Sequence, residues 1–243
     1  MQTRYIWLSV IAVLLAFAGG FLLANSLNRA ELERLRAENE SIKTSGGAPG
    51  TPGSTQKLSP DEIRAAVAEA DAKASNFQTQ KAIGLALYRY GAIERDSEVL
   101  KEAARLLERA AELDPKDVDV LIGAGNANFD YAYFNKLNEP FAVARKYYER
   151  ALAQDPQNAE AHTEIGLTYF LQDPPDDTKA IENFRRSLAL NGKYERGLEF
   201  MIQALARAGR KDEAQKYLDQ LRQVNPQSSS LQGLADQVAN SGK

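Results

Sequence analysis

The chain opens with a long block in which no charge interrupts the apolar positions. Residues 6–24 read "IWLSVIAVLLAFAGGFLLA" and contain no charged side chain. A helix of this length spans about 28 Å, close to the hydrocarbon thickness of a bilayer. Arg4, Tyr5 and Trp7 lie where charged and aromatic residues commonly border a membrane. The pattern predicts a transmembrane anchor over residues 5–24 and a single-pass membrane protein.

The sequence leaves two questions about this segment open. Ala16 and Ala18 are small residues of the kind that precede a signal-peptide cleavage site, but apolar residues continue beyond them. This favours an uncleaved anchor. Counting basic residues on each side would place the bulk of the chain in the cytoplasm. A short N-terminal tail before an exported domain favours the other side, so we expect an extracytoplasmic (periplasmic) location, with the cytoplasmic side as the alternative.

Residues 25–43 mix charged and apolar positions and are predicted to form a helical stalk. Its apolar seam alternates in steps of three and four residues, as the a and d positions of a coiled coil do. Two heptads are too few to establish a coiled coil from sequence. We expect either weak self-association through residues 28–42 or a solvated helical extension of the anchor. The seam consists of Leu32, Leu35, Asn39 and Ile42.

A polar segment separates this stalk from the rest of the chain. Residues 44–57 are rich in Gly, Pro, Ser and Thr and have no apolar period, which is typical of a flexible linker. Ser59 and Glu62 then have the spacing of a capping box, with Pro60 at the first helical position. A helix is therefore predicted to begin there, at the start of a domain over residues 58–243.

The remaining sequence repeats one element, in which a helix ends, a turn follows and another helix begins. A small residue precedes each turn at a close-packing position, as Ala103, Ala144, Ala180 and Ala214 do. The recurrence of this element along the chain indicates a stack of helical hairpins, because one hairpin cannot bury its apolar face alone. The four turns are "AAELDPKD" (110–117), "ALAQDPQN" (151–158), "SLALNGKY" (187–194) and "QLRQVNPQ" (220–227).

The clearest unit is residues 159–194, with Gly166, Tyr169, Ala180 and Phe184 at characteristic positions. These residues resemble the tetratricopeptide repeat family, whose unit is a helix-turn-helix. The resemblance implies an all-α helical-hairpin solenoid and a protein that binds other proteins. We expect a capping helix at 229–240 after the last repeat. The predicted repeats are 77–117, 118–158, 159–194 and 195–228.

Composition and motifs exclude several other functions. The net charge is −3, with both signs interspersed, so a nucleic-acid partner is not expected. The chain has no cysteine, and its single histidine, His162, is a poor basis for a metal site. The stretch "GAGNANF" (123–129) lacks the ending of a phosphate loop and is predicted to lie within a helix. No set of nucleophile, base and orienting group is visible. We therefore expect neither catalysis nor a cofactor or metal.

The family resemblance implies a concave groove lined by the first helix of each repeat. Three aromatic residues occupy the same repeat position there, and aromatic rings provide large contact areas for a peptide. The alternative is that these rings pack between helices. The candidate groove residues are Lys81, Leu85, Tyr88, Ile122, Asn126, Phe129, Thr163, Leu167, Phe170, Phe200 and Gln203.

The function expected from the sequence is that of a membrane-anchored interaction scaffold or assembly factor. It would bind a partner protein or peptide in the groove, in an architecture similar to bacterial membrane-tethered repeat proteins. One family pattern is not matched. Repeat proteins that clamp the terminal carboxylate of a chaperone use several cations, whereas only Lys81 fits here, and Glu160 and Glu164 replace two of them. The alternative is a permanent structural subunit of a larger membrane complex.

Overall fold

The structure, a computed structural model, describes residues 57–241. The chain divides into two compact units, Met1–Lys73 and Ala74–Lys243. In the first unit, α3 (Pro60–Ala72) begins with the predicted capping box. The Ser59 side chain accepts a hydrogen bond from the backbone N–H of Glu62, and the Glu62 carboxylate accepts one from the backbone N–H of Ser59. The prediction of a helix start at this point is confirmed.

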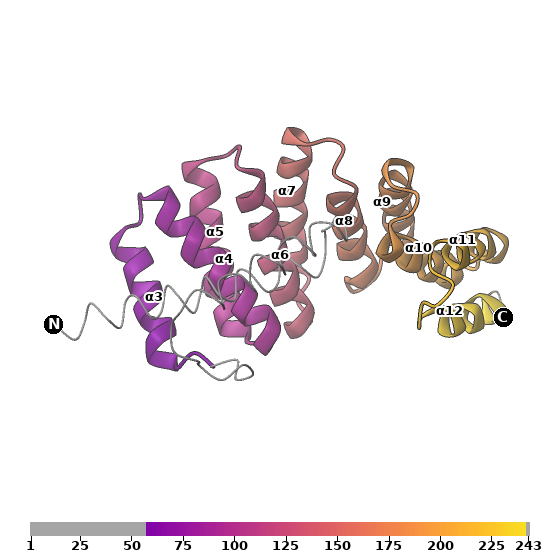
Figure 1. Ribbon diagram of the computed structural model, residues 1–243, viewed down its shortest axis with the longest axis horizontal. Coiled ribbons are helices and arrows are strands. Elements are labelled where there is room, and N and C mark those ends of the chain that lie inside the picture. Colours follow the sequence, from indigo (N-terminus) through magenta and orange to yellow (C-terminus); the bar gives the residue numbers. More distant parts are fainter. Residues whose placement is uncertain (1–56, 242–243) are drawn as a thin grey trace, which may run out of the picture. The chain divides into compact units, whose positions relative to one another are not determined.

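The second unit is a succession of antiparallel helical hairpins (Figure 1). The part of the chain that the structure describes contains helices and no strand. This agrees with the predicted all-α solenoid. The helices of the second unit are α4 (Phe77–Glu94), α5 (Ser97–Leu113), α6 (Val118–Asn135), α7 (Glu139–Gln154), α8 (Ala159–Leu171), α9 (Asp177–Leu190), α10 (Glu195–Arg207), α11 (Lys211–Val224) and α12 (Leu231–Asn240).

The turns between successive hairpins share one local structure. At each turn an Asp or Asn side chain accepts a hydrogen bond from the backbone N–H two residues further on, at 3.1 to 3.2 Å. Such side chains replace the next helical hydrogen bond and so end the helix. The repeated Asp/Asn-x-x pattern of the sequence is thus the cause of the repeated turns. The four residues are Asp114, Asp155, Asn191 and Asn225.

Close packing inside each hairpin depends on small residues. The four predicted alanines, Ala103, Ala144, Ala180 and Ala214, are completely buried, which confirms their role. Gly125 of α6 lies directly against the Tyr148 ring of α7, where a Cβ atom would clash with the ring. The "GAGNANF" stretch is therefore part of a packed helix, as predicted.

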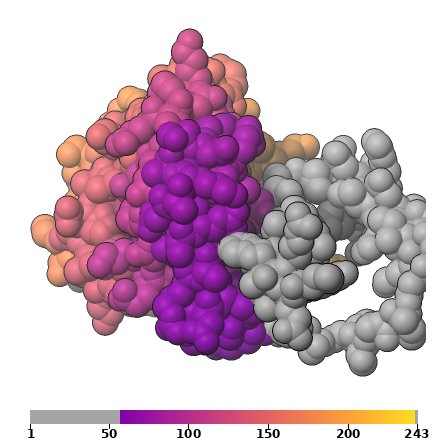
Figure 2. Space-filling model, turned by 90° about the vertical axis from the view of Figure 1, so that its left-hand side faces the viewer, coloured from indigo at the N-terminus to yellow at the C-terminus, as the bar shows by residue number. Residues whose placement is uncertain are grey.

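The first helices of the hairpins lie closer to one another than the second helices do. α4 contacts α6, α6 contacts α8 and α8 contacts α10, whereas successive second helices have few contacts with each other. The first helices therefore line the inner side of the stack. In the space-filling view of Figure 2, the magenta surface of the earlier helices of the second unit adjoins the salmon and orange surface of the later ones. A groove lined by the first helices would lie on this inner side.

One expectation is corrected by the structure. None of the helices in residues 57–241 is long and apolar enough to cross a membrane, which contradicts the predicted single-pass membrane localisation. The repeat helices alternate apolar and polar faces, because one face of each helix packs on its neighbours and the other meets solvent. The segments predicted as anchor (5–24) and stalk (25–43), with its self-association, lie outside the described residues, as does nearly all of the linker (44–57).

Candidate functional site

The predicted groove residues fall into two groups. Phe129, Thr163 and Leu167 are buried within the packing of the stack and present no surface to a partner. The others are partly exposed on the first helices of the hairpins. These partly exposed residues are Lys81, Leu85, Tyr88, Ile122, Asn126, Phe170, Phe200 and Gln203.

The buried members make contacts that explain their position. Phe129 of α6 meets Phe141 of α7 edge to face, with ring centroids 5.4 Å apart. The Thr163 hydroxyl of α8 donates to the Ser187 hydroxyl of α9 at 2.8 Å. Each residue joins the two helices of its own hairpin. Both therefore fit the alternative in which the predicted groove side chains pack between helices.

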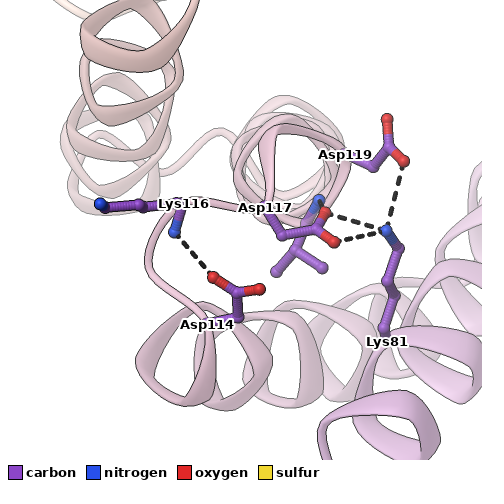
Figure 3. A network of polar contacts seen from close by, with 6 residues as sticks. Lys81, Asp114, Lys116, Asp117 and Asp119 are labelled. Carbon is purple, nitrogen blue, oxygen red and sulfur yellow. Dashed lines mark hydrogen bonds and ion pairs between the residues drawn. The ribbon is translucent and has the colours of Figure 1, made fainter.

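Lys81 is occupied by partners from the next hairpin (Figure 3). Its Nζ atom donates to Asp117 at 2.7 and 2.9 Å and to Asp119 at 3.2 Å. Partial burial lowers the pKa of Lys81, but the two carboxylates outweigh burial and raise it above its ordinary value. Asp117 also caps α6 by accepting the Val120 N–H at 2.9 Å. Lys81 therefore links α4 to the start of α6 and is not a free cation for a peptide.

A hollow opens at the C-terminal end of the stack, between α8, α10 and α12. Its volume is about 480 Å³. On one side, the Arg207 guanidinium stacks on the Phe170 ring, 3.8 Å from its centroid, and pairs with Asp177. The hollow brings two predicted groove residues together with α12, whose part in a site was not predicted. It is lined by Phe170, Gln203, Ala206, Arg207, Asp236, Gln237, Asn240 and Ser241.

The middle of the inner side holds a network of ionisable groups. The Arg196 guanidinium of α10 donates to both carboxylate oxygens of Glu164 of α8, one of them at 3.4 Å. Burial raises the pKa of Glu164 to about 7, opposed by Arg196 and reinforced by Glu160 and Asp130. Burial likewise raises the pKa of Asp130 of α6 to about 6, opposed by Arg196 and by a hydrogen bond from Tyr88 of α4.

Asn126 lies next to this network on α6. Its side-chain oxygen accepts the hydroxyl of the completely buried Tyr148 at 2.8 Å. This bond orients the amide, whose NH₂ group carries two donors suited to a ligand.

The structure offers no arrangement for metal chemistry in the residues it describes. No group of three or more His, Cys, Asp or Glu side chains there is close enough to hold an ion. His162 is half-buried, and its Nδ1 atom makes no hydrogen bond. Burial, together with nearby Arg186, lowers the pKa of His162, which favours the neutral imidazole of a packing residue.

Models of known protein families match part of the hairpin stack. Two models described as tetratricopeptide repeat match residues 137–195 and 178–238. Residues 137–238 are thus similar to tetratricopeptide repeats. The matched residues extend from α7 into α12 and include the residues that line the hollow, except Asn240 and Ser241. No curated protein matches the chain in sequence.

Solved structures with the same fold include those of MamA and PilF. A crystal structure of MamA has a TM-score of 0.53 and 23% identity over 68% of this chain and 87% of its own. MamA of Desulfovibrio magneticus has a TM-score of 0.55 and 15% identity over 84% and 99%. PilF of Pseudomonas aeruginosa has a TM-score of 0.54 and 17% identity over 98% and 85%. At these identities the likeness establishes the fold alone.

Proposed function

We propose that this chain is a protein-interaction module whose inner helices bind an extended segment of a partner protein. The observation that carries the proposal is the hollow between α8, α10 and α12. A concave site in which an aromatic ring lies among a few convergent polar groups is the usual form of a binding site. No catalytic group is required of such a module.

The chemistry around the hollow suits a peptide chain. Gln203 and Gln237 carry amides that both donate and accept, as a peptide backbone needs. The Phe170 ring, held edge to face against Phe200 at 5.8 Å, supplies a rigid apolar wall. Arg207 is already paired with Asp177. Among the described residues, the Asp236 carboxylate that lines the hollow accepts a hydrogen bond from Gln232 and forms no ion pair, so an acidic segment is disfavoured.

The binding surface that we propose continues from the hollow along the inner helices. Leu85, Tyr88 and Ile122 provide partly exposed apolar area at its N-terminal end. Between them and the hollow, the Asn126 amide can donate to a peptide carbonyl. A segment spanning this surface would contact the first helix of every hairpin.

Site-specific photo-crosslinking tests the proposal. A photo-reactive amino acid is placed at Gln203 in the hollow and, as a matched control, at Gln215, an exposed glutamine on the second helix α11. We expect a discrete adduct from Gln203 and none from Gln215. A folded protein that yields no adduct at Gln203, or the same adducts at both positions, would contradict groove binding.

A second candidate function is a permanent subunit of a larger complex. One observation favours it: Ile93 at the end of α4 and Tyr133 and Leu137 at the end of α6 are 40% to 52% exposed. Exposed apolar side chains at hairpin ends are suited to a permanent interface with another subunit. Crosslinking from position 133, together with co-purification that withstands high salt, would support this function over capture in the groove.

A further inference from the structure

The ionisable network on the inner side connects all four hairpins. Arg196 of α10 donates to both carboxylate oxygens of Glu164 of α8. Asp130 of α6 interacts electrostatically with both of these groups and accepts a hydrogen bond from Tyr88 of α4. These helices belong to four successive hairpins, and the inner helices contact one another in order. The protonation state of the network therefore affects the packing of the hairpins on one another, and not one helix alone.

The charges in this network do not balance when every carboxyl group is ionised. Arg196 is the cation that acts on Asp130, Glu160 and Glu164 alike. Three carboxylates against one guanidinium leave an excess of two negative charges in a region where Glu164 is only 5% exposed. Buried charge without a partner is costly, and each added proton removes one unit of it.

Within residues 57–241, the remaining neighbours do not supply the missing positive charge. Tyr148 of α7 and Tyr194, which precedes α10, interact with the same carboxylates but carry no positive charge. Tyr194 also hydrogen bonds Arg196. Protonation of the carboxyl groups is thus the simplest way to remove the excess negative charge.

We propose that Asp130, Glu164 and Arg196 form a pH-dependent link between the second, third and fourth hairpins, which holds more tightly when Asp130 and Glu164 are protonated. In the tight state Asp130 and Glu164 are protonated and neutral, so the remaining charges of Arg196 and Glu160 offset each other. In the loose state three ionised carboxylates, those of Asp130, Glu160 and Glu164, share one arginine across α6, α8 and α10.

The direction of the pH effect follows from the folded and unfolded states. Burial raises the pKa of both carboxyls in the folded chain, to about 6 for Asp130 and about 7 for Glu164, so the folded state holds their protons more tightly. Their stabilising contribution is present below about pH 4 and is lost as the pH rises through 6 and 7. His162, whose pKa is lowered, acts in the opposite sense as the pH falls, so the test compares variants and not the wild type alone.

Thermal unfolding of the full chain without any partner tests this link, independently of the proposed function. The double variant Asp130→Asn/Glu164→Gln resembles the protonated state at every pH. We expect the wild-type melting temperature to fall by roughly 5 °C relative to this variant between pH 5.5 and pH 8. Glu182→Gln, which removes an exposed carboxyl of α9, is the control and should follow the wild type.

Carbon-13 NMR of the Glu164 carboxyl in the wild type gives a second test that does not depend on the variant folding. We expect titration near pH 7 and a shift of its midpoint in Asp130→Asn, because one neighbouring negative charge is removed. A midpoint below pH 5, or parallel pH profiles of wild type and double variant, would overturn the proposal.

Discussion

The Arg196 guanidinium of α10 donates to both carboxylate oxygens of Glu164 of α8, and so joins two successive hairpins through a buried acid. Removing one member of such a pair leaves the other without compensation. We expect Arg196→Met to lower the free energy of unfolding by about 3 kcal/mol at pH 8 and by less at pH 5.5, where Glu164 can take up a proton. Urea unfolding at the two pH values measures this.

The matched control for Arg196→Met is Arg186→Met. Arg186 forms an exposed pair with Glu182 one turn away on α9. Exposed pairs of this kind contribute about 0.5 kcal/mol or less. Equal losses in the two variants would mean that the Arg196–Glu164 pair has no special role between the hairpins.

The contact of Gly125 with the Tyr148 ring gives a steric prediction. A Cβ atom at position 125 would overlap the ring, so we expect Gly125→Ala to destabilise the chain by about 2 kcal/mol. Gly233 of α12 has nothing within 4 Å of the equivalent atom, and Gly233→Ala should stabilise by up to about 1 kcal/mol. Melting temperatures that move in the same direction for both would contradict this packing.

Phe129 and Gln203 are both predicted groove residues, but one lies in the core and the other at the surface. Phe129 is buried against Phe141, and we expect Phe129→Ala to cost about 3 kcal/mol of stability. Gln203 is partly exposed in the hollow, and Gln203→Ala should leave stability within about 0.5 kcal/mol. Denaturant unfolding tests both, and a stable Phe129→Ala variant would return that ring to the candidate surface.

Asp117 combines two roles, as the cap of α6 and as the partner of Lys81. We expect Asp117→Ala to cost about 1 to 2 kcal/mol, whereas Asp119→Ala, at a position 79% exposed, should cost little. Although burial alone would raise the pKa of Asp117, its bonds to Lys81 and to Val120 lower it, so its contribution is lost as the pH falls below about 4. Circular dichroism at pH 7 and pH 3 would reveal a difference between Asp117→Ala and wild type that shrinks in acid.

The fold followed from local features of the sequence, and particular residues show why. The Asp/Asn turns at Asp114, Asp155, Asn191 and Asn225 are local hydrogen-bonding patterns, so they can be recognised without knowing the tertiary structure. The buried alanines Ala103, Ala144, Ala180 and Ala214 likewise belong to close packing that the sequence marks by small residues. Periodicity and turn chemistry therefore predicted the helical hairpins well.

The candidate site was harder to predict because it depends on contacts between hairpins. Repeat register alone placed Phe129 and Phe170 at equivalent positions, yet Phe129 packs on Phe141 while Phe170 lines the hollow. Lys81 was expected to face a ligand, but the neighbouring turn supplies two carboxylates to it. The predicted capping helix is present as α12, but its contribution to the hollow depends on its packing beside α10, which the repeat pattern does not encode.

Binding of the partner segment captured by crosslinking at Gln203 tests the central claim most directly. Calorimetric titration of that segment compares the wild type with Gln203→Ala, Gln237→Ala and the outer control Gln215→Ala. We predict a loss of affinity of about tenfold for each of the two variants in the hollow, equivalent to about 1.4 kcal/mol, and no change for Gln215→Ala. Unchanged affinity in both hollow variants, with the chain folded, would contradict binding on the inner side of the stack.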